Sequence, residues 1–185
     1  MFDALRQRVP LHVMARDAAL IALAVATLLW ARSQQLSDSG WAWPSAGLAA
    51  LLLALAGYLI HEWGHLCGAL ISRASVILPP GINQAFLFRW DSDRNNRRQF
   101  FWMASGGFVA SGLTVVAYLM VLDTAFLADR LALTLTALGV LATLIIEVPE
   151  FLGVARGGPI PNGAAFVAAD ADQAAAASAP GERSR

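Results

Sequence analysis

The sequence predicts an all-α membrane protein with about four transmembrane helices and a small β-hairpin-like loop on its cytoplasmic side. Two observations lead to this fold class. Of the 185 residues, 57% are hydrophobic and only 14% are charged, whereas a soluble domain carries about 25% charged residues. The apolar residues also gather in four long stretches, and a helix that crosses a bilayer needs about 20 such residues.

The first two apolar stretches are Ala18–Ala31 and Trp41–Ser72. The first is short for a bilayer, but it can extend back through His12–Met14 if Arg16 pairs with Asp17 or reaches toward the lipid headgroups. Its length alone does not decide whether it crosses completely. The second stretch is long enough to cross the bilayer and continue beyond it.

The third and fourth stretches are Phe100–Leu122 and Leu131–Val148. After them comes a Gly/Pro segment, Gly157–Gly163, and then an Ala-rich tail. We therefore divide the chain into a transmembrane domain, residues 1–163, and a tail, residues 164–185. The tail has too few large apolar residues to build a core and is predicted to be disordered or a weak helix.

The polar loop Arg73–Gln99 separates the second stretch from the third. Ala74–Leu78 and Ala85–Trp90 are rich in residues that favour strands, and turn residues (Pro79, Pro80, Gly81 and Asn83) lie between them. This order predicts a hairpin at the membrane surface.

Small residues recur on the second and third stretches. Gly64 and Gly68 are four positions apart on the second, and Ser105-Gly106-Gly107 opens the third. Such faces let transmembrane helices approach closely. We expect these two spans to pack together.

The distribution of arginine predicts the orientation. The N-terminus and the loop after the second stretch are rich in arginine, whereas the loops after the first and third hold one each (Arg6, Arg8, Arg16; Arg73, Arg89, Arg94, Arg97, Arg98; Arg32; Arg130). Basic loops stay in the cytoplasm. We therefore expect an integral protein of a bacterial inner membrane with both termini cytoplasmic. Trp90 and Trp102 would mark the inner interface.

Charge and cysteine count exclude other classes. The formal net charge is zero, which argues against a nucleic-acid partner. Cys67 is the only cysteine, so neither an intramolecular disulfide nor a Cys-rich zinc site can form. The lipid bilayer is the expected partner, and the oligomeric state is not defined by the sequence.

The segment His61-Glu62-Trp63-Gly64-His65 carries the clearest chemical signal. Two histidines four positions apart share one face of a helix, with Cβ atoms about 5–6 Å apart. Both rings can then reach one zinc ion, with Glu62 placed to act on a water that the metal activates. Apolar residues follow the motif, so these ionisable groups lie inside a span, where such groups are costly and usually functional. We predict His61 and His65 as metal ligands and Glu62 as general base.

The third metal ligand is left open among Glu150, Glu147 and Asn162. Glu147 and Glu150 end the fourth stretch at i,i+3 spacing, although Pro149 between them can break the helix. The amide oxygen of Asn162 is a poorer zinc ligand than a carboxylate. Cys67 is two positions past His65 and is expected to point away from the histidine face.

Taken together, these features resemble the site-2 protease family of intramembrane zinc metalloproteases. The resemblance covers about residues 46–163 and includes the motif late in a span, the hairpin-like loop with a basic end, and a Gly-containing start of the next span. It implies cleavage of membrane-embedded protein or peptide substrates. The family carries an Asp-Gly pair whose aspartate is the third ligand, and here Asn162 stands at that place.

The function we expect is therefore a zinc-dependent intramembrane endopeptidase that uses metal-activated water and Glu62. The departure at Asn162 keeps a catalytically silent relative, which binds metal or partner helices, as the alternative. A membrane di-metal oxidase is disfavoured because three histidines supply too few ligands for two metals. A structural membrane protein without metal is the remaining class.

Overall fold

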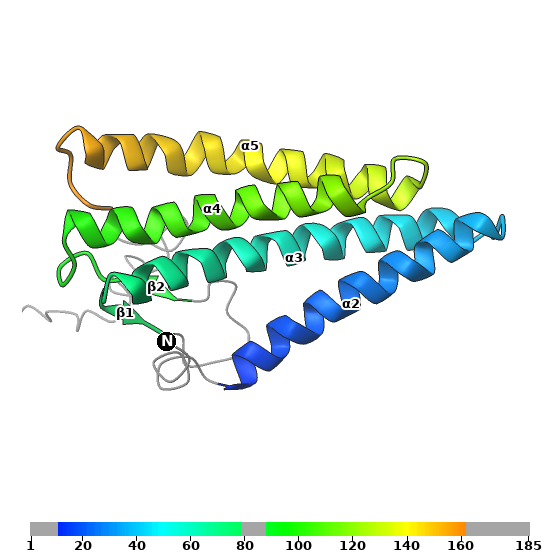
Figure 1. The fold of residues 1–185 in the computed structure, drawn as a ribbon, viewed down its shortest axis with the longest axis horizontal. Coiled ribbons are helices and arrows are strands. Elements are labelled where there is room, and N and C mark those ends of the chain that lie inside the picture. Colours follow the sequence, from blue (N-terminus) through cyan, green and yellow to red (C-terminus); the bar gives the residue numbers. More distant parts are fainter. Residues whose placement is uncertain (1–10, 79–87, 162–185) are drawn as a thin grey trace, which may run out of the picture.

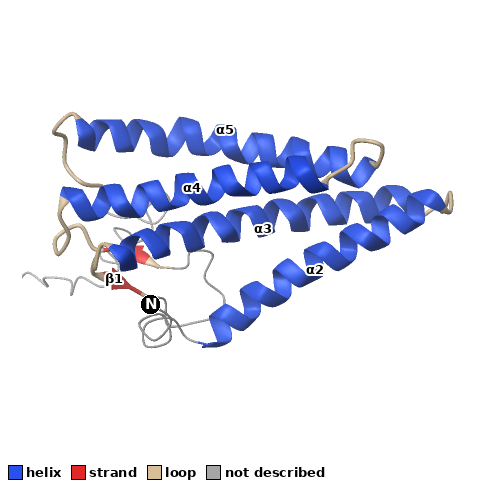
Figure 2. Ribbon diagram, in the orientation of Figure 1, coloured by secondary structure: helices blue, strands red, loops and turns tan. Residues whose placement is uncertain are grey.

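The computed structural model describes residues 11–78 and 88–161. Within these ranges it has four long helices and one two-stranded sheet (Figure 1 and Figure 2). The helices are α2 (Leu11–Leu36), α3 (Ala42–Ile71), α4 (Arg97–Val121) and α5 (Leu127–Ala155). Each is long and apolar enough to cross a membrane. The prediction of a mainly helical chain with four candidate spans is therefore confirmed.

The first helix is longer than the apolar stretch that predicted it. α2 begins at Leu11 and has 26 residues, which is enough for a bilayer. The extension is possible because Arg16 pairs with Asp17, with 2.7 Å between Nε and Oδ1. Trp63 of α3 donates a second hydrogen bond to Asp17, over 2.9 Å. Asp17 is thus buried without being unpaired.

The last helix corrects one prediction. We considered that Pro149 could break it, but α5 continues through Pro149 to Ala155. A proline removes one helix hydrogen bond, and transmembrane helices tolerate this loss because neighbouring groups and small local adjustments compensate for it. Glu147 and Glu150 therefore lie on one uninterrupted helix.

The predicted hairpin is present in a shorter form. β1 (Val76–Ile77) pairs antiparallel with β2 (Arg89–Trp90), and Val76 lies opposite Trp90. The expected turn residues lie outside the described part of the chain. Trp90 is not the interfacial anchor that we expected, since it is only 6% exposed and packs edge-on against Phe100. Its hydrophobic surface is covered by α4 instead of lipid.

Close packing of α3 against α4 confirms the prediction from the small residues. A Cβ atom added to Gly64 would lie under 3.0 Å from the carbonyl oxygen of Gly106, and one added to Gly68 would lie under 3.0 Å from that of Trp102. Real Cβ atoms do not approach backbone so closely. The two helix backbones are therefore in contact, as the small residues on both helices allow.

Helix α3 is the centre of the bundle. It lies between α2 and α4 in Figure 1 and also contacts α5. At the end away from the motif, α2, α3 and α5 pack through small side chains, mostly alanine (Ala24, Ala31, Ala46, Ala49, Ala50, Ala56, Ala128, Ala132). This arrangement leaves the motif in the last third of α3, facing α4 and α5.

Candidate metal centre

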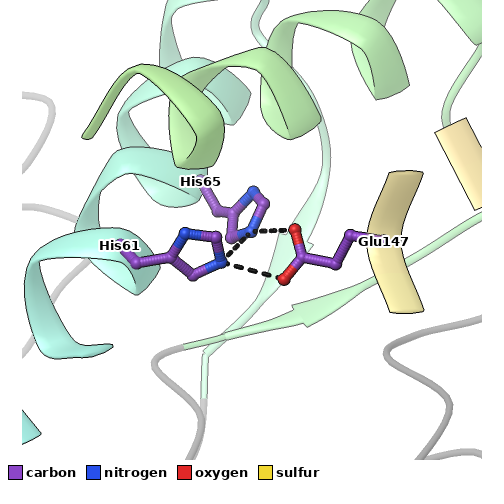
Figure 3. Close-up of side chains that lie close together, drawn as sticks. All are labelled: His61, His65 and Glu147. Carbon is purple, nitrogen blue, oxygen red and sulfur yellow. Dashed lines mark hydrogen bonds and ion pairs between the residues drawn. The ribbon is translucent and has the colours of Figure 1, made fainter. Parts of the chain in front are cut away.

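Three side chains converge where α3 faces α5. The Nε2 atoms of His61 and His65 are 2.9 Å apart. Glu147 of α5 reaches both rings, with 3.0 Å from its Oε1 to His61 Nε2 and 3.4 Å from its Oε2 to His65 Nε2. Figure 3 shows the carboxylate opposite the two facing rings. All of these ligand atoms lie within 4.8 Å of one another.

The helices explain why the rings meet. His61 and His65 are four positions apart on an unbroken helix, so they lie one turn apart on the same face. Glu147 lies on α5, and the continuity of that helix through Pro149 keeps it beside α3. His61 is buried, the side chain of His65 is 12% exposed, and that of Glu147 is 30% exposed.

Helix α4 orients both rings through its backbone. His65 Nδ1 lies 3.0 Å from the carbonyl oxygen of Met103. His61 Nδ1 lies 3.2 Å from that of Gly107 and 2.8 Å from Ser111 Oγ. A carbonyl oxygen can only accept, so each Nδ1 carries a proton and donates it. In neutral rings both Nε2 atoms are then unprotonated, and the Glu147 carboxylate, which also only accepts, faces His61 Nε2 over 3.0 Å with no hydrogen between them.

With both rings neutral, only hydrogen-bond acceptors meet at this point. Two neutral rings would direct their Nε2 lone pairs at each other over 2.9 Å, beside a carboxylate. Such an arrangement is repulsive unless a metal ion or a shared proton lies between the atoms. Oε2 of Glu147 is a buried oxygen that makes no hydrogen bond with the described residues, and its contact is His65 Nε2 at 3.4 Å. Two imidazoles and a carboxylate form a ligand set that catalytic zinc uses.

The distances also suit a zinc ion. Zinc binds nitrogen and oxygen at about 2.0–2.2 Å, which for a tetrahedral ion corresponds to roughly 3.3 Å between neighbouring ligand atoms. The two Nε2 atoms are 2.9 Å apart. One oxygen of Glu147 lies 3.0 Å from His61 Nε2, and its other oxygen lies 3.4 Å from His65 Nε2, so each contact is near that value. A histidine that binds metal through one ring nitrogen usually donates a hydrogen bond from the other, often to a backbone carbonyl. The residues present therefore fit zinc.

Of the three candidates for the third ligand, Glu147 is the one that the structure brings to the histidines. Glu150 is half-buried on the same helix and does not belong to the converging group. Asn162 lies outside the described residues. Cys67 is half-buried and is also not part of the group.

Glu62, the predicted general base, is half-buried on α3 directly after His61. One residue turns a helix by about 100°, so its side chain leaves α3 beside the histidine face and not on it. It is not one of the three converging side chains. Its role in catalysis stays a prediction.

Three α4 residues were not predicted as part of the site: Met103, Gly107 and Ser111. Of these, only Gly107 was considered from the sequence, as part of a small packing face. The spacing of four residues between Gly107 and Ser111 places them on the side of α4 that meets the motif, and this regularity is the one signal that the sequence contained. The contribution of Met103 is its backbone carbonyl, which no side-chain pattern reveals.

Comparison of the chain with protein-family models, with curated proteins and with solved structures finds no match in any of the three.

Proposed function

We propose that the chain is a zinc-dependent intramembrane endopeptidase. The observation that carries this proposal is the convergence of His61, His65 and Glu147 on one point. The point lies within helices long and apolar enough to cross a membrane. Isolated ionisable groups in such helices are costly, so a cluster of three calls for a function. The resemblance of the motif and its surroundings to site-2 proteases supplies the expected substrate, a membrane-embedded peptide bond.

The three ligands would hold zinc, and zinc, when bound, polarises a carbonyl and lowers the pKa of a bound water toward about 7. Met103 and Gly107 accept the Nδ1 protons and keep the free Nε2 atoms directed at the metal position. Glu62 takes a proton from the attacking water and passes it to the leaving amine. His61 is only 6% exposed, which limits the access of bulk water to its ring.

Membrane placement is part of the proposal. We propose an integral membrane protein with the hairpin and the motif end of α3 on the cytoplasmic side of a bacterial inner membrane. The arginine-rich loop between α3 and α4 supports this orientation. Extraction of the protein from isolated membranes by detergent, but not by high salt or alkaline carbonate, would test the placement independently of activity.

The activity test compares metal content with cleavage. The wild type, Glu62→Gln and His61→Ala would be purified in detergent and assayed for zinc and for cleavage of a fluorogenic transmembrane peptide and of casein. We expect about one zinc per chain in the wild type and in Glu62→Gln, with cleavage only in the wild type. His61→Ala should lose both. Full activity in Glu62→Gln would exclude the general-base role.

A catalytically silent relative is the second candidate. Asn162 stands where the resembled family has its aspartate ligand, and the third converging group is a glutamate on another helix. This different ligand set supports metal binding without cleavage. This candidate would be favoured if the wild type holds one zinc per chain but cleaves neither the transmembrane peptide nor casein. Proteins of the membranes that contain it should also stay intact.

A further inference from the structure

Four exposed arginines surround the motif end of the bundle. Arg73 follows α3, Arg89 lies on β2, Arg98 lies in the first turn of α4, and Arg156 caps the end of α5. We call these four residues the arginine rim. Neighbouring arginines have protein partners: Arg94 pairs with Asp91, and Arg97 binds the end of α5. Within residues 11–78 and 88–161, the four rim guanidinium groups have no hydrogen bond or ion pair to an acidic group.

Hydrogen bonds between the helix ends hold the rim together. Gln99 donates to the carbonyl oxygen of Arg73 over 3.2 Å, which joins the end of α3 to the start of α4. Arg97 donates to the carbonyl oxygen of Gly157 over 2.6 Å, which joins the start of α4 to the end of α5. Trp90, the neighbour of Arg89, packs on Phe100. These contacts tie the end of α3, the hairpin and the end of α5, which carry Arg73, Arg89 and Arg156, to α4, which carries Arg98.

The backbone conformation at Arg73 is a second, independent observation about the arginine rim. Its φ is +56°, in the left-handed region where glycine is the usual residue at the end of a helix. A side chain there costs roughly 1 kcal/mol or more. Arg73 N–H and Ala74 N–H still close the α3 end, over 3.1 Å to Leu70 and 2.8 Å to Ala69. The chain thus carries an exposed guanidinium at a position where glycine would fold more easily.

The opposite end of the bundle is different. Arg32 is paired there with the fully buried Asp129, and Arg130 is the one exposed arginine among the described residues of that end. Exposed arginines are therefore more numerous at the motif end of the described structure than at the opposite end.

The rim begins where the apolar surface ends. Ile71 is 56% exposed and Trp102 is 47% exposed, and each lies within a few residues of a rim arginine. Side chains of this kind face lipid tails or the interface, and tryptophan is enriched at headgroup depth. In the membrane placement proposed above, a guanidinium just beyond them lies at the level of the phosphates.

We propose that the arginine rim binds the headgroups of anionic phospholipids. Guanidinium groups match phosphate oxygens in charge and geometry, and exposed arginines near an anionic leaflet each contribute to binding. This inference rests on the membrane placement proposed above and not on the peptidase activity. The distribution of the four charges over the ends of three helices and the hairpin suits a layer of separate headgroups better than one compact acidic peptide.

Native mass spectrometry of the full chain in detergent tests the proposal. The protein would be titrated with phosphatidylglycerol and, separately, with phosphatidylcholine of the same acyl chains. We expect preferential retention of phosphatidylglycerol by the wild type. The variant Arg73→Asn/Arg98→Gln should bind it about 25-fold more weakly, since each arginine near an anionic surface contributes about 1 kcal/mol, or about fivefold. Asparagine is chosen at position 73 because it tolerates a positive φ.

Arg130→Gln is the matched control, because it removes one exposed arginine from the opposite end. It should keep the wild-type preference. Glycerol phosphate, added in excess, should not displace the lipid, and displacement would indicate a site for free phosphate. Equal retention of the two lipids by the wild type would overturn the proposal. The variant Asp170→Asn/Asp172→Asn/Glu182→Gln removes three acidic groups from the tail. If only this variant prefers phosphatidylglycerol, the chain's own tail occupies the arginine rim, and the proposal is overturned.

Discussion

Gly107 of α4 lies directly against the imidazole of His65. A Cβ atom at position 107 would be 2.5 Å from Nε2 and 2.6 Å from Nδ1 of that ring, so the absence of a side chain there makes room for the histidine. The carbonyl oxygen of the same glycine is 3.2 Å from His61 Nδ1. One residue of α4 therefore makes room for the ring of His65 and orients that of His61.

Gly107→Ala should displace the His65 ring and lower the affinity for zinc at least about tenfold, the lower end of the range for groups that orient metal ligands. The measurement is a zinc titration with a competing chelator in detergent. Gly112→Ala is the control on the same helix, since a Cβ there meets nothing within 4 Å. Equal affinities in the two variants would show that the ring does not need its present position.

Glu147→Gln should abolish stoichiometric zinc binding, because an amide oxygen is a much poorer zinc ligand than a carboxylate. Glu150→Gln, three residues further along α5, should keep it. Metal analysis of the purified proteins distinguishes the two variants. If the wild type holds no metal under any loading condition, a shared proton is the cation between the three groups, and the peptidase proposal fails.

Ser111→Ala should weaken zinc binding less than Gly107→Ala does. The hydroxyl lies 2.8 Å from His61 Nδ1, but the Gly107 carbonyl remains as a second acceptor for the same proton. We expect a loss of about tenfold or less. Ser105→Ala on the same helix is the control, and a loss larger than that of Gly107→Ala would mean that the hydroxyl is the principal acceptor.

Gly64→Ala should destabilise the bundle by about 1–3 kcal/mol, the usual cost of overpacking a close contact. The added methyl group would meet the backbone of Gly106 at under 3.0 Å, so α3 and α4 must separate. Thermal unfolding in detergent, followed by circular dichroism, measures the change. Gly47→Ala in α3 meets nothing within 4 Å and should be neutral or slightly stabilising; a similar loss in both would argue against the close contact.

Arg32→Gln should destabilise the protein more than Asp129→Asn. Asp129 is fully buried and also accepts from the backbone N–H of Asp123 over 2.7 Å. Removal of the arginine leaves a buried charge without its partner, at a cost of about 3 kcal/mol. Removal of the aspartate leaves a partly exposed arginine that water can solvate. The order of the two melting temperatures checks this prediction, and the reverse order would contradict it.

Periodicity and composition were sufficient for much of the fold. The four apolar stretches predicted the four helices because a bilayer-length helix needs a continuous run of apolar residues, and such a run is visible without any knowledge of contacts. The boundaries were less certain. α2 starts before its apolar stretch because Asp17 is paired with Arg16 and Trp63, and the Trp63 contact joins residues 46 positions apart.

For the site, the sequence by itself determined the pair His61 and His65, because helix geometry alone brings residues four apart onto one face. Only the tertiary structure decided that Glu147, and not Glu150, meets them, since the rotation and depth of α5 depend on its packing against α3. The contributions of Gly107 and Met103 were likewise decided by the packing of α4. Every residue has a backbone carbonyl group, so the sequence does not mark these two. Only the close approach of α4 to α3 gives their carbonyl oxygens a histidine partner.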